Sequence, residues 1–333
     1  MDLSKYKSEC DELGITVEEL ARFVEETKKN VSIETAIHEY KKHLQEQCLQ
    51  KEITEGTLES YCAVLNNILD YLVLVHKQNI RINQLNIELY DQYAEYRSVQ
   101  LGKKLSANTY NKGMYVLSAL ITFAFDKGLM SHYIKLDNWQ KIDFDEPKYL
   151  FPSEVNKIIS EARLGRNELR NTTIIMLLLY TGCTLKELLS VKRKDLDLRK
   201  NTLFILENGA RKSRVIPLHN DLEEILGIYM PFQVSEPDDL LFFDHKRRPL
   251  KIDSVQVCIK NILRDAGLSD HSSKSFRDTY AVNSLYQGTT LEELVSLLGL
   301  DDAQRASRYM LFLDKYRNKI TEERERIEKT SFR

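Results

Sequence analysis

The chain has few of the residues that interrupt or cross-link a fold: 12 Gly, 6 Pro and 5 Cys among 333 residues. This low Gly and Pro content excludes a fibrous or Pro/Gly-rich disordered chain and favours a mostly helical one. The cysteines are odd in number, widely spaced and without a CxxC pair, which argues against a disulfide framework or a zinc site and for a reducing cytosol. They are Cys10, Cys48, Cys62, Cys183 and Cys258.

Long apolar runs are also missing. The longest, from Ile174 to Tyr180, is far shorter than the roughly 18 residues that indicate a membrane span, so it predicts a buried core helix. Residues 1–30 are acidic and lack the apolar stretch of a secretory signal. We therefore expect a cytoplasmic protein with no membrane partner.

No excess of positive charge is visible in the whole chain, whose formal net charge is −2. The local distribution is more informative, because basic residues gather in the second half. Residues 186–214 contain nine Lys or Arg and four Asp or Glu. A second basic cluster consists of Lys246, Arg247, Arg248 and Lys251.

The length and the 42% hydrophobic content predict two domains with real cores. Apolar periodicity and capping residues predict an N-terminal bundle of four helices, at 32–47, 57–77, 88–100 and 106–128. An irregular acidic stretch at 138–151 then separates this bundle from the rest.

The second part is predicted to contain helices and a small β-hairpin or sheet. Helices are expected from residue 153 and at 171–180, 185–191, 221–229, 253–266, 275–286 and 290–298, and strands at 202–207 and 213–218 around a turn at 208–209. The predicted organisation is an acidic segment 1–30, a helical domain 31–140, a linker 141–152, a second domain 153–313 and a charged tail 314–333.

Three short motifs follow one another in the second part. They are Thr181-Gly182-Cys183-Thr184-Leu185-Lys186-Glu187-Leu188, the box Lys274-Ser275-Phe276-Arg277-Asp278-Thr279-Tyr280-Ala281, and Leu298-Gly299 followed ten residues later by Tyr309. A phenol that attacks a phosphodiester forms a covalent ester, and its transition state needs fixed cationic donors. An arginine followed by a tyrosine, in this order, suits that chemistry.

The order of these motifs resembles the C-terminal domain of the tyrosine recombinase (phage integrase) family, and residues 31–128 resemble its SAM-like core-binding domain. The resemblance implies a mainly α fold with a small β-sheet and site-specific recombination or integration of double-stranded DNA through a 3′-phosphotyrosine, as in mobile genetic elements. It implies no cofactor or metal, and catalytic roles for Tyr309, Arg277 and Lys274. It also implies a tetramer on paired sites, with 314–329 passing to a neighbour and Leu311, Phe312 and Leu313 as its apolar anchor.

Three positions depart from the family pattern. Thr184 stands where the first motif has an arginine, Gly209 where the hairpin has an acid lysine, and Leu300 where a His or Trp follows Leu-Gly. Arg211 and Lys212 lie close enough in sequence to replace the lysine. The protein is therefore expected either to cleave DNA with these substitutes or to be a pseudo-recombinase that binds DNA or a recombinase partner without cutting.

The net acidity leaves one further interpretation, a helical protein-interaction adaptor that does not bind DNA. If DNA is bound, the exposed cations and one amide are the expected backbone contacts. These are Lys192, Arg193, Lys194, Arg211, Lys212 and Arg214 in the second domain, and Lys103, Lys104 and Asn108 in the first.

Overall fold

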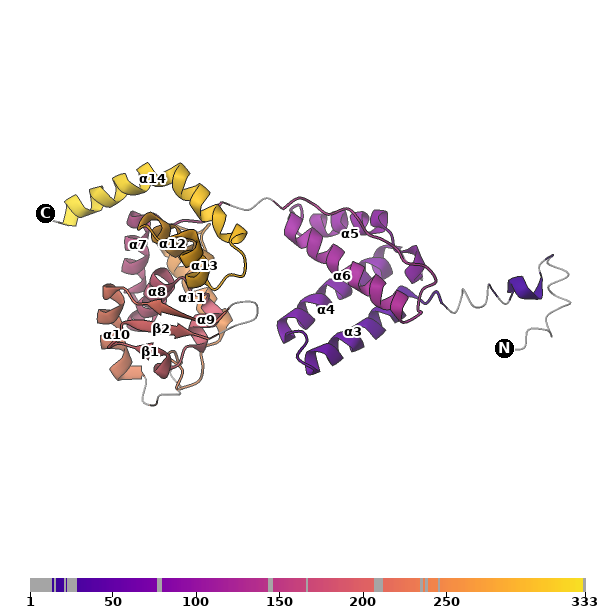
Figure 1. The fold of residues 1–333 in the computed structure, drawn as a ribbon, viewed down its shortest axis with the longest axis horizontal. Coiled ribbons are helices and arrows are strands. Elements are labelled where there is room, and N and C mark those ends of the chain that lie inside the picture. The colour runs from indigo at the N-terminus through magenta and orange to yellow at the C-terminus, as the bar shows by residue number, and fades with distance from the viewer. Residues whose placement is uncertain are drawn as a thin grey trace. The chain divides into compact units, whose positions relative to one another are not determined.

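The computed structural model divides the chain into two compact units, Met1–Asp143 and Phe144–Arg333 (Figure 1). The structure describes residues 14, 16–20, 22, 29–76, 80–142, 146–165, 167–206, 212–233, 236, 239–244 and 246–331. The predicted acidic segment 1–30 and the turn at 208–209 lie largely or wholly outside these residues. Each unit has its own hydrophobic core and is described by itself.

The first unit is the predicted bundle of four helices (Figure 1). A polar residue precedes each helix and accepts a hydrogen bond from a backbone N–H of its first turn, which fixes where the helix begins. These caps are Ser32, Thr54, Asn86 and Ser106. The helices are α3 (Ile33–Leu49), α4 (Glu55–Tyr71), α5 (Ile87–Gln100) and α6 (Ala107–Asp126), with a π-helical turn at Leu72–His76 and a 3₁₀ turn at Ile82–Gln84.

Helix α6 supplies much of the core of the bundle. Leu117 and Leu120 are fully buried, and they belong to the same core as Ile37 of α3 and Leu65 of α4. Among the described residues, one helical segment, Glu55–Val75, is long enough and apolar enough to cross a bilayer, judged by length and composition alone. Core helices of soluble proteins pass the same test, and this segment contributes residues to the bundle core.

The second unit is mainly helical with a three-stranded antiparallel sheet, in the order β1-β2-β3. Leu203 of β2 pairs with Leu196 of β1 and Ile216 of β3, and all three side chains point into the core. The helices are α7 (Pro152–Ala162), α8 (Glu168–Thr181), α9 (Leu185–Ser190), α10 (Asn220–Gln233), α11 (Ile252–Asp265), α12 (Ser273–Tyr286), α13 (Leu291–Leu298) and α14 (Gln304–Ser331). The strands are β1 (Leu196–Asp197), β2 (Thr202–Ile205) and β3 (Arg214–Pro217), and a 3₁₀ turn spans Arg193–Asp195.

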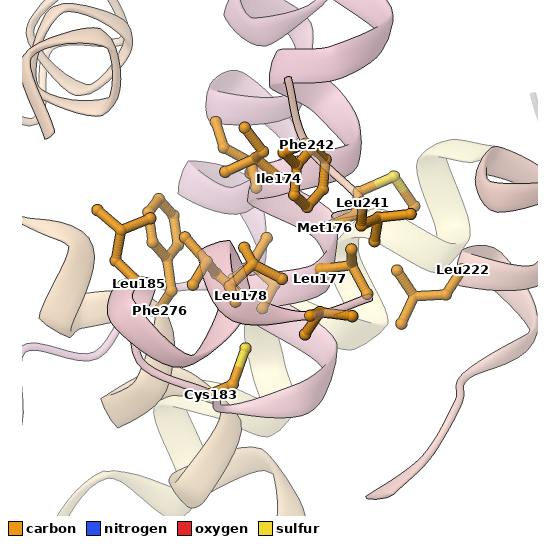
Figure 2. Close-up of a cluster of buried hydrophobic side chains, with 14 of the residues drawn as sticks. Ile174, Met176, Leu177, Leu178, Cys183, Leu185, Leu222, Leu241, Phe242 and Phe276 are labelled. Carbon is orange, nitrogen blue, oxygen red and sulfur yellow. The ribbon is translucent and has the colours of Figure 1, made fainter. Parts of the chain in front are cut away.

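Helix α8 runs through the middle of this unit and is buried on all sides. Its apolar residues fill the space between α7, α10 and α12, as a helix that is hydrophobic all round must do. Leu177 and Leu178 are fully buried, in the same cluster as Leu222, Phe242 and Phe276 (Figure 2). This packed core fixes the position of the C-terminal end of α8, which leads directly into Cys183 and Thr184.

Two elements extend beyond the predicted ranges. Helix α10 continues past Pro231 to Gln233, because Tyr229 and Met230 are buried and hold the chain in helical form while Pro231 is exposed. The predicted tail 314–329 belongs to the same continuous helix as Tyr309, since nothing between Gln304 and Ser331 breaks a helix.

The three residues of the expected apolar anchor of the tail lie in different environments. Phe312 and Leu313 are buried in the core of their own unit, whereas Leu311 is 70% exposed. The helical phase causes this difference, because three consecutive residues of an α-helix cannot share one face. Further along α14, Ile320 is fully buried in the same core.

Candidate DNA-cleavage site

One cavity of about 540 Å³ in the second unit brings the motifs together. Its walls come from the start of α9, from α11, from the first turns of α12, from the second residue after α13 and from the start of α14. The polar and charged lining residues are Thr184, Lys186, Gln256, Ser273, Lys274, Arg277, Asp278, Arg305, Arg308 and Tyr309, with Cys183, Leu185, Ile252 and Leu300 as the apolar ones.

Tyr309 lines this cavity with a hydroxyl that is already engaged. The side chain is 4% exposed, and its hydroxyl donates to Asp278 Oδ1 at 3.0 Å. Arg308 Nη2 donates to the same phenol oxygen at 2.8 Å and to Asp278 Oδ1 at 2.5 Å. Burial, and then the nearby Asp278 carboxylate, raise the pKa of Tyr309 despite the opposing Arg308. The resting phenol is therefore protonated and held in one orientation.

Arg277 is fixed by two helix ends. Its Nη1 donates to Gly182 O and its Nη2 to Leu298 O, both at 2.6 Å. These carbonyls belong to the last turns of α8 and α13, where backbone oxygens have no helical partner. The Thr-Gly and Leu-Gly motifs therefore act as structural supports that orient the arginine toward the cavity.

Glycine is required at both helix ends. Gly182 and Gly299 have φ values of +60° and +61°, a left-handed conformation that residues with a Cβ disfavour. A Cβ on Gly182 would lie 2.2 Å from the Tyr280 ring, and one on Gly299 would lie 2.9 Å from Arg214 Nη1. The chain thus approaches itself closely at the two points that hold Arg277.

Beneath the cavity lies a buried ion pair between Glu187 and Arg214. Arg214 Nη1 is 2.8 Å from Glu187 Oε1, and Arg214 Nε donates to Leu297 O at 2.7 Å. The side chains of Arg214 and Glu187 are 5% and 0% exposed, so Arg214 is not accessible for the DNA contact predicted for it. Burial opposes the ionisation of Glu187, but Arg214 and the Thr184 backbone hold its pKa below the usual value of 4.5.

The two departures from the family motifs that the structure describes are both in the cavity wall. Thr184 caps α9, and its hydroxyl and backbone N–H both donate to Glu187 Oε2. The polar atoms of Thr184 are therefore engaged at the N-terminus of α9. Leu300 lines the cavity and packs against the apolar core, so it offers no donor. Gly209 and Arg211 lie outside the described residues.

Four charged lining residues were missed from the sequence: Lys186, Asp278, Arg305 and Arg308. Arg305 is exposed and lies four residues before Tyr309 on α14, so the two share a helix face. Arg308 precedes Tyr309 directly, and its guanidinium carbon lies 4.6 Å from the centre of the tyrosine ring. The i, i+4 spacing of Arg305 and Tyr309 was the one signal that pointed to an added cation.

The other predicted contact residues lie away from the cavity lining. Lys192, Arg193 and Lys194 belong to the turn before β1, where the Lys192 backbone N–H donates to Asp195 and Arg193 N donates to Asp239 O. Lys212 is exposed two residues before β3, with its Nζ 4.0 Å from Asp301 Oδ1. In the first unit, Lys103, Lys104 and Asn108 are exposed around the start of α6. Among the described residues, no group of three or more His, Cys, Asp or Glu side chains is placed to hold a metal ion.

These observations define a two-domain protein whose second domain presents a tyrosine and several cations in one cavity. Residues 148–314 match the model of the phage integrase family, and residues 36–138 match that of the phage integrase SAM-like domain. The chain therefore belongs to the phage integrase, or tyrosine recombinase, family.

Curated relatives and solved structures agree with this assignment. The chain is 24% identical over 269 residues to tyrosine recombinase XerC of Staphylococcus carnosus (strain TM300), covering 78% of this chain and 88% of that protein. It is 25% identical over 272 residues to XerC of Staphylococcus saprophyticus, with the same coverage of 78% and 88%.

Among solved structures, a lambda integrase dimer bound to a COC′ core site superposes with a TM-score of 0.70 at 19% identity, over 88% of this chain and 80% of that one. The Tn1549 transposon integrase in complex with transposon right end DNA gives 0.66 at 13% identity, over 84% and 94%. At these identities the superpositions show the shared fold.

Proposed function

We propose that this protein cleaves and rejoins double-stranded DNA at specific sites, with Tyr309 as the nucleophile that forms a 3′-phosphotyrosine. The observation that supports this proposal is the shared cavity, in which Tyr309 lies with Arg277, Lys274 and further cations. Because the phosphotyrosine bond keeps the energy of the broken phosphodiester, the reaction needs no outside energy source or cofactor.

The cations of the cavity supply what Thr184 and Leu300 do not. The transition state gathers negative charge on the non-bridging phosphate oxygens, and guanidinium groups match these oxygens in geometry. Arg277 is held rigidly for this purpose by two carbonyls. Arg305 and Arg308 approach from α14, on a wall different from that of Thr184, so the charge is supplied from the nucleophile's own helix.

The departing 5′ oxygen must also receive a proton. Lys274 is the proposed acid, since it is exposed and lines the same cavity. Lys212 is a second source near the site, because its backbone oxygen lies against Gly299, next to Leu300 of the cavity wall. Each of these side chains ends in an ammonium group, which carries N–H donors and no acceptor.

We further propose that the protein acts in the cytoplasm as an oligomer on paired DNA sites. Its structural neighbours include a lambda integrase dimer bound to a COC′ core site and a lambda integrase tetramer bound to a Holliday junction. The proposed backbone contacts are the exposed Lys103, Lys104, Lys194 and Lys212 and the partly buried Lys192.

The test begins with Tyr309→Phe protein, which is used to enrich duplexes by binding from a pool of randomised sequence. The enriched duplexes are then nicked next to the bound site, so that a cleaved strand diffuses away and a covalent adduct accumulates. We expect the wild-type protein to form an adduct that survives denaturing electrophoresis and Tyr309→Phe to form none.

A second candidate function, DNA binding without cleavage, is favoured by Thr184 and Leu300 and by the 4% exposure of Tyr309. Enrichment of duplexes without any adduct from the wild-type protein would establish this pseudo-recombinase. Failure to enrich any duplex at low salt would instead favour the protein-interaction adaptor.

A further inference from the structure

Asp278 is the buried titratable group closest to the proposed reaction, and the family resemblance gave it no role. Its side chain is 1% exposed and lines the cavity. Oδ1 receives the hydroxyl of Tyr309 and the guanidinium of Arg308, while Oδ2 accepts the backbone N–H of Lys148 at 3.1 Å. Both oxygens are therefore held in place, and one of them is directed at the phenol proton.

The phenol cannot attack a phosphate while it holds its proton, and burial with the adjacent carboxylate raises the pKa of Tyr309. Release of this proton to water would thus be rare at neutral pH. A base within hydrogen-bond distance of the proton removes this difficulty, and Asp278 Oδ1 lies 3.0 Å from the phenol oxygen.

The other charged groups that face the cavity are cations. Together they favour negative charge on a reacting group, and none of them can accept the phenolic proton while it is charged. They are Lys186 from α9, Lys274 and Arg277 from α12, and Arg305 and Arg308 from α14, with the Cys183 thiol as the remaining titratable group. Burial raises the pKa of this thiol to about 11, so it is also a protonated group.

We propose, on the basis of the function proposed above, that Asp278 accepts the proton of Tyr309 during strand cleavage and returns it during rejoining. The Tyr309 oxygen forms its bond to phosphorus as the bond from phosphorus to the 5′ oxygen breaks. The phenolic proton passes to Asp278 Oδ1, and the 5′ oxygen takes a proton from the Lys274 ammonium. Rejoining reverses each transfer, so atoms and charges balance.

Arg308 completes this step because it contacts both the donor and the acceptor of the proton. Its Nη2 is 2.5 Å from Asp278 Oδ1 and 2.8 Å from the phenol oxygen. When the carboxylate becomes neutral, the negative charge has moved toward the phosphate, and Arg308 can stabilise it there without a change of position. Asp278 and Arg308 thus act as a pair.

The experiment compares wild-type protein, Asp278→Asn and Asp278→Glu on the nicked, enriched duplexes, with Asp126→Asn as a matched control on an exposed aspartate at the end of α6. Each duplex is prepared with an ordinary 5′ oxygen or with a 5′ sulfur at the scissile position. A sulfur leaving group needs little protonation, so the second substrate removes the demand for an acid and leaves the demand for a base.

We expect Asp278→Asn to bind the duplex as the wild type does and to form adduct roughly 10²- to 10⁴-fold more slowly on both substrates. Its rate should rise about tenfold per pH unit in the alkaline range, because the phenol must then ionise into solvent. The wild-type and Asp126→Asn rates should change little over the same range, and Asp278→Glu should regain part of this flat profile.

Each other result decides against the proposal. Wild-type rates for Asp278→Asn would show that the carboxylate is dispensable. A slower rate with an unchanged pH profile, or a loss that the 5′ sulfur restores, would show a structural role or an acid role. If the wild type itself forms no adduct, the proposed function fails and this inference fails with it.

Discussion

Two arginines at the base of the cavity illustrate how single residues divide the tasks of structure and charge. Arg214 neutralises Glu187 in the interior, while Arg277 uses two backbone carbonyls and stays directed at the cavity. Arg277 Nη1 also lies 4.0 Å from Glu187 Oε2, so the carboxylate is shared between them. A buried carboxylate that is hydrogen-bonded in this way makes the position of each arginine depend on the other.

Arg214→Met should destabilise the second unit. The substitution keeps an unbranched side chain but leaves Glu187 without its partner, which costs about 3–5 kcal/mol when one member of a buried pair is lost. Urea unfolding followed by a probe in the second unit would measure this change. The double variant with Glu187→Gln should recover most of the loss, and an unchanged midpoint for Arg214→Met alone would contradict the buried pair.

The pH dependence of stability should carry the signature of Glu187. Because its pKa in the folded protein lies below the usual 4.5, the carboxylate stabilises the fold above that pH and loses this contribution as pH falls through the lowered value. The difference in unfolding free energy between wild type and Glu187→Gln should therefore be largest above about pH 5 and shrink below pH 4.5. A difference that grows with acidity would refute this assignment.

At the scale of elements, α14 joins the proposed nucleophile to the charged tail in one helix. Its second half packs on its own chain: Ser153 donates to Glu323 at 2.9 Å, and Arg324 donates to Asn283 at 2.7 Å. If this half passes to a neighbouring protomer, as the family resemblance implies, these contacts must first break. The helix is thus both part of the cavity wall and the proposed means of oligomer contact.

Ile320→Ala should loosen the second half of α14 without unfolding the domain. Ile320 is fully buried, and such truncations cost about 2–5 kcal/mol. Hydrogen exchange should show faster amide exchange in 314–331 and unchanged protection in α12 and α8. The exposed residue Asn318 provides the control, since Asn318→Ala removes no buried group. Equal protection in the two variants would mean that burial of Ile320 contributes nothing to the stability of this half of α14.

Most elements could be predicted because their signals are local. Ser106 and Thr290 cap the helices that follow them, as their spacing indicated. The two-residue strand β1 could not be predicted, because it depends on pairing with β2. The site was only partly predictable for a similar reason. Arg277 and Tyr309 belong to motifs that can be read from the sequence. Asp278 and Arg308 come into contact only because α12 packs against α14.

At the scale of the whole molecule, a slightly acidic protein is proposed to bind a polyanion. Net charge does not decide such binding, because phosphate contacts act within the short range of screened electrostatics. The candidate contacts are grouped on the connection before α6 and on the segments around the sheet. Both units would then share the electrostatic part of the affinity.

The salt dependence of binding should report the share of the first unit. Replacement of both Lys103 and Lys104 by Gln should make the slope of log affinity against log salt less negative by about 1–2 units, with little effect on folding, because both side chains are exposed. Fluorescence anisotropy on an enriched duplex would measure this slope. Lys329→Gln, at an exposed position near the end of α14, is the control, and identical slopes for all three proteins would remove this connection from the interface.

The chemical identity of the DNA-linked residue tests the central claim most directly. Trypsin cuts after Arg308 and Lys315, so Tyr309 would appear in the peptide Tyr309-Met310-Leu311-Phe312-Leu313-Asp314-Lys315, which contains no other tyrosine. After wild-type protein reacts with the nicked duplex and the DNA is digested by nuclease, mass spectrometry should find a nucleotide remnant on this peptide. A remnant on a different peptide, or none where the duplex is bound, would contradict the assignment of Tyr309 as the nucleophile.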